Sequence, residues 1–277
     1  YNRNLFFMWF IKIINPAILK KTYWCIWGGD LYRRRSFKQS IQSRTIEKLR
    51  KPIIRNMGGF ITHIKGDFEL ARDWYNTRGT YQYSFMYPSN LYKKYPLNNQ
   101  ENYTDRVYIQ IGNSANPSNN HLDVLDKIQR YKDTNIEILC PLSYGNRDYA
   151  KKVISHGIEI FDDKFIPITE FIPFEKYLEM LNKVDVAIFN HKRQQAMGNI
   201  TTLLGLGKKV YIREEITTWQ FCVDHDLKVY SANGDYHDLF EKMDEEIKQK
   251  NVQNMKIKFS EEKLVEDWKK IFNEGDI

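Results

Sequence analysis

The sequence predicts an α/β protein with parallel sheets, and three observations lead to this fold class. Short runs rich in β-branched and aromatic residues alternate with helical stretches along the chain, an order that requires parallel strands joined by crossover helices. Two strand-like runs, 107–111 and 185–189, lead through polar loops into helix starts, as in sheets that bind ligands at their carboxyl edge. The 277 residues, 42% hydrophobic and 28% charged, are enough for two modest globular domains.

The front half reads as alternating strands and helices. A strand is expected from Leu5 to Phe10, followed by a short helix opened by Asn15-Pro16, and a second strand runs from Thr22 to Trp27. A long basic helix spans 36–56, with Pro52 breaking or ending it. Further strands are expected at 60–64 and 81–85, separated by a helix from Asp67 to Tyr75.

A stretch rich in Pro, Asn, Tyr and Lys between Met86 and Arg106 has no periodicity and is the best linker candidate. We therefore place the domains at 1–98 and 99–277, with the last helix a candidate to return to the first domain. Beyond 107–111, strands are expected at 136–140, 158–161, 185–189, 209–212 and 228–230, and helices at 118–132, 147–156, 174–183, 196–206, 217–225, 236–250 and 260–273.

The net charge is +7, and much of the excess lies in one basic front segment. A solvated helix face is the ordinary explanation for such a segment. The functional alternatives are contact with an anionic membrane or with a polyanionic acceptor, and the candidate residues for it are Arg33, Arg34, Arg35 and Lys38. Nucleic acid is a poorer fit, because no recognition motif accompanies the charge.

Cysteine usage and apolar runs indicate the cell compartment. Cys25, Cys140 and Cys222 are far apart and show no metal-ligand spacing, so we expect reduced core residues of a cytoplasmic protein. No secretory signal is visible, and the apolar run near the N-terminus is too short to span a bilayer. Because the chain starts with Tyr1 and a strand-like segment follows at once, we expect the front domain to be incomplete.

Two polar loops at strand ends are the candidate site for a nucleotide diphosphate. The first contains Gly112, Asn113, Ser114 and Asn119; its ordinary explanation is a turn with a helix cap, and it is not a dinucleotide-binding GxGxxG motif. The second brings two cations and two amides to a helix start and consists of Lys192, Arg193, Gln194, Gln195, Gly198 and Asn199. A cation beside a helix N-terminus clamps phosphate well, so together the loops favour a phosphorylated ligand.

Several carboxylates and histidines follow other strands. Asp30, after Gly28-Gly29, can cap the next helix or act as a general base, and His63 and Asp67 are rival bases. A carboxylate at Glu214 can hold ribose hydroxyls, with an ordinary exposed acid as the alternative. The histidines show no ligand spacing, so we expect no metal and no cofactor.

Six ordered segments resemble one bacterial enzyme family, the TDP-N-acetylfucosamine:lipid II N-acetylfucosaminyltransferases, or 4-α-L-fucosyltransferases, which have the GT-B fold. The likeness runs from about residue 5 to about residue 232. The segments are 26–32 (IWGGDLY), 111–114 with 118–121, 141–144, 174–178, Arg193-Gln-Gln195 with Gly198, and 213–220 (REEITTWQ).

The resemblance implies a metal-independent, inverting enzyme whose two Rossmann-like domains face each other across a cleft. It would move a 4-acetamido-4,6-dideoxygalactose from TDP to a polyprenyl-diphosphate-linked glycan at the cytoplasmic face of the inner membrane, as a peripheral protein in surface polysaccharide synthesis. The donor would lie on both loops, Tyr144 and Glu214, and the acceptor near Asp30. The chain departs from the family at Gly28-Gly29, Ala196-Met197 and Glu215-Ile216, which leaves the donor sugar open.

Two other functional classes remain open at this point. One is a nucleotide-sugar enzyme of the same fold that does not transfer, such as an epimerase or a hydrolase. The other is an inactive partner in a polysaccharide assembly complex.

Overall fold

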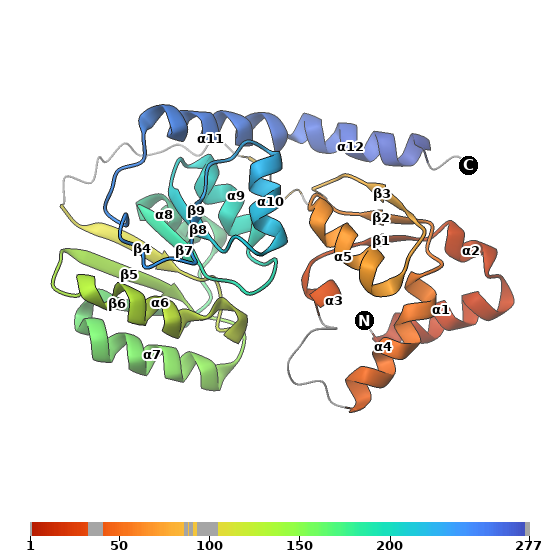
Figure 1. Cartoon of the computed structure of the whole chain (residues 1–277), viewed down its shortest axis with the longest axis horizontal. Helices are drawn as coiled ribbons and strands as arrows, with labels where there is room; N and C mark the ends of the chain where they lie inside the picture. The colour runs from red at the N-terminus through yellow and green to blue at the C-terminus, as the bar shows by residue number, and fades with distance from the viewer. Residues whose placement is uncertain (1, 33–40, 86–87, 89–90, 93–104, 275–277) are drawn as a thin grey trace. The chain divides into compact units, whose positions relative to one another are not determined.

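The computed structural model describes residues 2–32, 41–85, 88, 91–92 and 105–274. The chain divides into two compact units (Figure 1), one formed by 1–88 with 261–277 and the other by 89–260. The C-terminal helix thus belongs to the same unit as the N-terminal residues.

The larger unit is built on a six-stranded parallel sheet with the order β6-β5-β4-β7-β8-β9. From β4, the strands β5 and β6 are added on one side, and β7, β8 and β9 are added on the other. The direction of strand addition therefore reverses between β4 and β7, which are neighbours. The strands are β4 (Val107–Ile111), β5 (Ile136–Pro141), β6 (Phe165–Ile168), β7 (Val186–Phe189), β8 (Lys209–Ile212) and β9 (Tyr230–Ser231).

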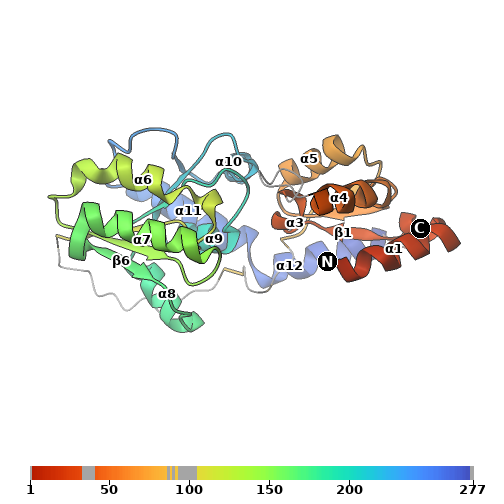
Figure 2. The ribbon, with the colours of Figure 1, turned by 90° about the horizontal axis from the view of Figure 1, so that it is seen from below.

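Helices cover both faces of this sheet (Figure 2). Helices α6 (His121–Ile128) and α7 (Arg147–Phe161) pack together, whereas α9 (Met197–Gly205) packs with α8 (Phe174–Lys183) and with α11 (Glu245–Lys258). Helix α10 (Thr217–Asp224) lies between β8 and β9 in the chain, and short 3-10 turns occupy Pro117–Asn119, Gln129–Tyr131 and Asp162–Lys164.

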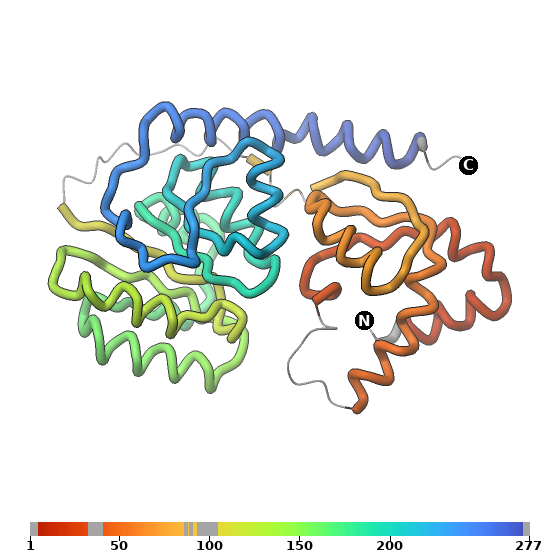
Figure 3. Tube along the Cα trace, in the orientation of Figure 1, coloured from red at the N-terminus to blue at the C-terminus, as the bar shows by residue number. Residues whose placement is uncertain are grey.

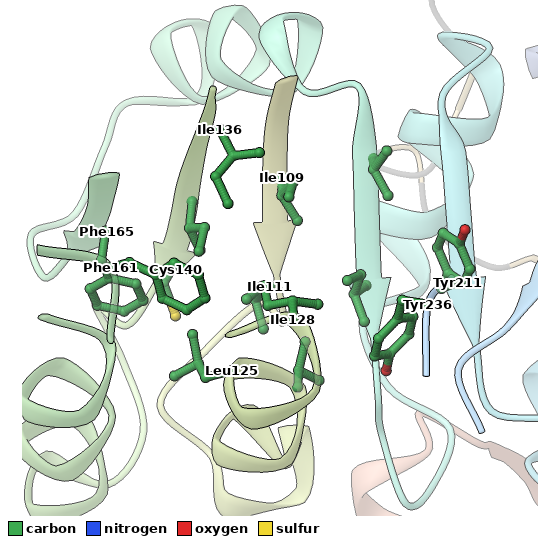
Figure 4. Packing of buried hydrophobic residues seen from close by; sticks show 14 of the residues in the cluster. Ile109, Ile111, Leu125, Ile128, Ile136, Cys140, Phe161, Phe165, Tyr211 and Tyr236 are labelled. Atoms are coloured by element: carbon green, nitrogen blue, oxygen red, sulfur yellow. The ribbon is translucent and has the colours of Figure 1, made fainter. Parts of the chain in front are cut away.

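The core of this unit follows from the alternation of side chains along the strands. Every second residue, such as Ile109 and Ile111 of β4, points toward α6 and α7 and packs on Leu125 and Ile128 (Figure 4). Because strands in the middle of a parallel sheet are covered on both faces, β7 and β8 are buried along their whole length.

The smaller unit contains a three-stranded parallel sheet, β1 (Tyr23–Cys25), β2 (Gly59–Ile61) and β3 (Thr80–Gln82), in that order. On one face, Phe60 packs with residues of α3 (Gly29–Tyr32), α4 (Ile41–Ile54) and α5 (Lys65–Tyr75). On the other, Ile61 packs on Ile271 of α12 (Glu261–Glu274), which runs along this sheet (Figure 3).

The strand expected at Leu5–Phe10 is wrong. These residues belong to helix α1 (Asn2–Ile14), which is followed by α2 (Ala17–Lys20). Periodicity cannot distinguish strand from helix in a short run that is apolar on all sides. The helix is held in place by α4, where the Leu49 carbonyl accepts a hydrogen bond from Trp9 Nε1 at 3.0 Å.

Three other expectations differ from the structure. The strand expected at 158–161 is the last turn of α7, and the strand itself comes later, at β6; β-branched Ile158 and Ile160 favoured strand locally, but packing of the helix overrode that preference. The helix expected from 236 begins only at Glu245, where Asp244 caps it. Pro52 neither breaks nor ends α4, which continues to Ile54.

Where α7 packs on β6, we expect that position 157 accepts no side chain larger than that of glycine. An added Cβ would stand 2.6 Å from the buried ring of Phe165. Overpacking a rigid core costs about 1–3 kcal/mol, more than the gain of up to about 1 kcal/mol in helix propensity. We expect Gly157→Ala to lower the free energy of unfolding, measured by urea denaturation, by about 1 kcal/mol.

The matched control is Ser155→Ala, at an exposed position of the same helix. It should leave the free energy of unfolding unchanged or raise it by a few tenths of a kcal/mol. A Gly157→Ala protein as stable as the unsubstituted chain would contradict the close packing.

Candidate functional site

The candidate site lies at the carboxyl edge of the larger sheet, where β4 and β7 end side by side. The Gly112 N–H donates to the Ile188 carbonyl at 3.0 Å, which fixes the start of the loop after β4 against β7. In doubly wound sheets, ligands bind where neighbouring strands lead in opposite directions. The two loops that the sequence singled out, 112–120 and 190–196, therefore start from adjacent strands.

Only glycine fits at the first position of the first loop. Gly112 has a φ of +65°, and an added Cβ would stand 2.5 Å from His121 Nε2 and 2.8 Å from Asn119 Oδ1. The backbone is thus held in the left-handed region, and it turns sharply over the buried side chains of the helix that follows.

Asn119 is the centre of the hydrogen bonding in this edge and is fully buried. Its Nδ2 donates to the carbonyls of Ser114 at 3.0 Å and Asn116 at 2.9 Å. Its Oδ1 accepts from the Asn113 N–H at 3.0 Å and lies 2.8 Å from His191 Nε2. One amide therefore shapes the first loop and joins it to the second.

Further side-chain bonds join the loops nearer the surface. Gln195 Nε2 donates to Asn113 Oδ1 at 2.9 Å, and Gln195 Oε1 accepts from Ser118 Oγ at 2.6 Å. Asn113 Nδ2 donates to the hydroxyl of Tyr144, a largely exposed residue after β5, at 2.9 Å. The structure thus brings Asn113, Ser114, Asn119, Tyr144 and Gln195 together.

Two buried histidines support this edge in their neutral form. Burial, assisted by the charge of Arg193 and by His121, lowers the pKa of His191 to about 3. Burial also lowers the pKa of His121 to about 4. Because Asn119 Oδ1 can only accept, His191 carries its proton on Nε2 and donates it there. Neither histidine was a sequence candidate, and both lie within the polar loops or directly after them.

The second loop supplies the cation and a helix N-terminus. Arg193 is half-buried, and its Nη1 donates to the Gln194 carbonyl at 2.9 Å. Gln194 is buried, and its Oε1 has no hydrogen-bond partner. Gly198 and Asn199 lie in the first turn of α9, where the first N–H groups have no intrahelical acceptor. This edge therefore offers positive charge and N–H donors, which suits an anion.

Two residues at this edge lie in segments that resemble the family but were given no role from the sequence. Arg213 directly follows β8, and it donates from Nη1 to Asn190 Oδ1 at 3.0 Å and pairs through Nη2 with Glu215 at 2.5 Å. Its position directly after a predicted strand could have indicated a role for Arg213 at the carboxyl edge of the sheet. The hydroxyl of Tyr177 in α8 donates to Asn199 Oδ1, and no local pattern marks that contact. The side chain of Glu214, by contrast, is exposed.

The smaller unit holds the candidate bases. Asp30 Oδ1 accepts from the Trp27 and Leu31 N–H groups at 2.9 and 3.0 Å, and Oδ2 accepts from Trp24 Nε1 at 2.7 Å. Both carboxylate oxygens thus hold the turn after β1. Asp67 is buried and accepts from the hydroxyl of Tyr32 at 2.9 Å, and His63 is buried two residues beyond β2.

Arg33, Arg34, Arg35 and Lys38 lie outside the described residues. Within the residues that are described, no group of three or more His, Cys, Asp and Glu side chains is placed to bind a metal ion. In the same part of the chain, every helix is too short or too polar to cross a bilayer. The three cysteines are free thiols.

Comparison with known proteins agrees with this geometry. The family model described as 4-alpha-L-fucosyltransferase, glycosyl transferase group 56, matches residues 1–276, which confirms the resemblance noted in the sequence.

Solved glycosyltransferases of the GT-B class have a similar fold. Sucrose-phosphate synthase from Thermosynechococcus elongatus is 12% identical with a TM-score of 0.67, over 91% of this chain and 66% of its own. Anabaena HepE in complex with UDP is 12% identical with a TM-score of 0.66, over 91% and 71%. A UDP-forming trehalose-phosphate synthase from Burkholderia xenovorans is 9% identical with a TM-score of 0.62, over 86% and 66%. The predicted GT-B fold is thereby confirmed, and this chain spans less than two thirds of both synthases.

The neutral histidines should make the protein sensitive to acid. The pKa of His121 is about 4 in the folded protein, against 6.5 for an unburied histidine. Its neutral form therefore contributes stability that is complete above pH 6.5 and is lost as the pH falls toward about 4. His121→Gln should remove up to about 1.4 kcal/mol per pH unit from the slope of unfolding free energy against pH in this window.

Urea unfolding at a series of pH values measures this slope. The control is Ser155→Ala, at an exposed position, which removes no titratable group and should keep the slope of the unsubstituted chain. Equal slopes for His121→Gln and the unsubstituted chain would show that His121 is not held neutral by the fold.

Proposed function

Because the chain belongs to the family of 4-alpha-L-fucosyltransferases, glycosyl transferase group 56, we propose that it transfers a deoxy-amino sugar from TDP to a lipid-linked glycan. The observation that carries this proposal is the contact between the two polar loops, where Gln195 hydrogen-bonds both Asn113 and Ser118. That contact makes one N–H-rich edge at the reversal point of the sheet, a place suited to a nucleotide diphosphate.

The diphosphate would be bound by the start of α9, with Gly198 and Asn199, and by the charge of Arg193. Arg213, held between Asn190 and Glu215, is a second guanidinium at the same edge. Together they would stabilise the negative charge that develops on the departing TDP, so that no metal ion is needed for this step. Anabaena HepE, a protein of similar fold, was solved in complex with UDP, which supports a nucleoside diphosphate as the kind of ligand. The preference for TDP and for 4-acetamido-4,6-dideoxygalactose rests on the family resemblance.

The reaction would be a single in-line displacement with inversion. A hydroxyl of the acceptor attacks the anomeric carbon, the bond from that carbon to the TDP oxygen breaks, and a general base takes the hydroxyl proton. Asp30 is the proposed base, with His63 and Asp67 as the alternatives. Three N–H donors of the turn after β1 hold the Asp30 carboxylate, so the position from which it would take the proton is fixed by the fold.

The polyprenyl-diphosphate acceptor would bring the protein to a membrane. We therefore propose a peripheral enzyme at the cytoplasmic face of the bacterial inner membrane, with anionic lipid as its partner. The net charge of +7 supports attraction to such a surface.

Nucleotide binding can be tested without an acceptor. TDP should raise the melting temperature, because a ligand at about a hundred times its dissociation constant stabilises by about 2.7 kcal/mol, whereas UDP, GDP and CMP should raise it less. Arg193→Ala should weaken TDP binding about tenfold or more, as expected for the loss of a hydrogen bond to a charged group. Gln195→Ala should also weaken it, because its hydrogen bonds to Asn113 and Ser118 hold the two loops together. Thermal shift over a range of nucleotide concentrations gives the affinities.

Lys152→Ala, at an exposed position of α7, is the control and should bind TDP normally. If no nucleotide changes the melting temperature at millimolar concentration, or if Arg193→Ala binds TDP as the unsubstituted chain does, the proposed donor site is wrong.

The general base can be identified by kinetics. Asp30→Asn should lower kcat by about 10²–10⁴ and leave TDP affinity unchanged, because Asp30 belongs to the smaller unit and both nucleotide loops belong to the larger one. His63→Gln and Asp67→Asn serve as the comparison, after circular dichroism has shown that each is folded. Transfer of labelled sugar is measured against hydrolysis of the donor. A loss of transfer confined to Asp67→Asn or His63→Gln would assign the base to that residue, and release of free sugar without transfer would favour a hydrolase.

A further inference from the structure

Helix α1 presents a stripe of exposed apolar side chains along one side. Phe6, Phe7, Phe10, Ile13 and Ile14 are each between 60% and 80% exposed. Their spacing of one, four, seven and eight residues places them on a single helix face. Ile18 of α2, also exposed, follows the stripe in the chain. Large apolar side chains gathered in one place on a surface usually mark a contact site.

The opposite side of α1 is occupied by its own unit. Leu5, Met8, Trp9 and Lys12 are half-buried, the helix contacts α4, and Trp9 Nε1 donates to the Leu49 carbonyl at 3.0 Å. Helix α1 is therefore anchored by one face, and the exposed stripe lies on the face that the described residues of its unit leave uncovered.

Helix α4 carries a basic stripe. Arg44, Lys48 and Lys51 of α4, and Arg55 directly after its last residue, are all exposed, and intervals of four, three and four residues align them along one side. Arg50 lies on another side, where it pairs with Glu47 at 3.1 Å and donates to the Asp30 carbonyl. Glu47 is the single acidic residue of segments 2–29 and 41–55, and Arg50 and Tyr75 hydrogen-bond its carboxylate. The positive charge of this surface is therefore not cancelled.

The two stripes lie on helices that contact each other through Trp9 and Leu49. Both helices belong to the smaller unit. We call the two stripes together the α1–α4 surface.

We propose that the α1–α4 surface binds an anionic phospholipid bilayer, with the apolar stripe of α1 inserted among the acyl chains and the basic stripe of α4 on the headgroups. An interfacial helix combines these two features, an apolar face and flanking Lys or Arg. At 13 residues, α1 is about 20 Å long, too short to cross the hydrocarbon core, so it lies in the plane of the surface.

The basic stripe argues for lipid over a second copy of the chain. In a two-fold dimer the same patch occurs on both sides of the interface, so the four cations of each copy would be brought to one interface together. Like charges brought together destabilise such an interface, whereas anionic headgroups neutralise them. Charge complementarity thus selects the bilayer.

This inference deepens the proposed role at a membrane, and it assigns that role to side chains the structure describes. Vesicle binding needs neither donor nor acceptor, so it is independent of catalysis. The proposed transfer reaction can be tested with a water-soluble acceptor in the absence of any membrane, so its failure would be seen there. The two proposals can therefore fail separately.

The test is flotation of the 277-residue chain with vesicles of phosphatidylcholine alone or mixed with phosphatidylglycerol. The chain should bind the mixed vesicles, and salt should weaken this binding by screening the charges. The triple variant Phe6→Ser/Phe10→Ser/Ile13→Ser should bind about tenfold more weakly or worse. Lys48→Glu/Lys51→Glu should also weaken binding and reduce its dependence on salt.

Phe171→Ser is the matched control, because Phe171 is 88% exposed and belongs to the other unit. It should bind vesicles as the unsubstituted chain does, and all variants should melt cooperatively, since the substituted side chains are exposed. The proposal is overturned if the unsubstituted chain ignores anionic vesicles, if the triple variant binds them equally well, or if Phe171→Ser is equally impaired. It is also overturned if light scattering shows a dimer that the triple variant dissociates, because a second copy then covers the stripe.

Discussion

The geometry of the two polar loops at the carboxyl edge of the larger sheet depends on the buried amide of Asn119. Its oxygen accepts from the Asn113 N–H and from His191, and its nitrogen donates to two carbonyls of its own loop. A buried amide satisfied on both atoms fixes its neighbours more firmly than an apolar residue would, because any displacement leaves a polar group without a partner. The two strand-end loops therefore behave as one rigid piece.

Charge at this edge is arranged around that rigid piece. The histidines beneath it are kept neutral by burial, so the positive charge comes from arginine, which stays protonated at any physiological pH. Arg193 extends from the second loop, and Arg213 reaches Asn190 from the end of the next strand. An anion at the start of α9 would thus meet fixed charge and N–H groups, whose orientation is set before the ligand arrives.

The smaller unit uses its polar residues differently. Asp30 holds the turn after β1 with both oxygens, so a structural role and the proposed catalytic one share the same carboxylate. Next to this turn, Arg50 of α4 donates to the Asp30 carbonyl, whereas Arg44, Lys48 and Lys51 of the same helix are exposed. The contact of α1 with α4 then determines which apolar side chains stay exposed. The proposed proton transfer by Asp30 and the proposed binding to a bilayer would therefore both depend on the position of α4.

The sequence by itself determined the strands that carry the donor loops, because 107–111 and 185–189 are strongly apolar and end in small polar residues, and such local signals do not depend on distant partners. It also indicated Asn113, Asn119 and Gln195, since amides are common where loops bind ligands. It misplaced 5–10 and 158–161, where strand and helix preferences are nearly equal and packing decided. Only the tertiary structure paired Gln195 with Asn113, Tyr177 with Asn199 and Arg213 with Asn190. Those contacts join residues from different strands and helices, and their partners follow from the order of strands in the sheet, which no local pattern encodes.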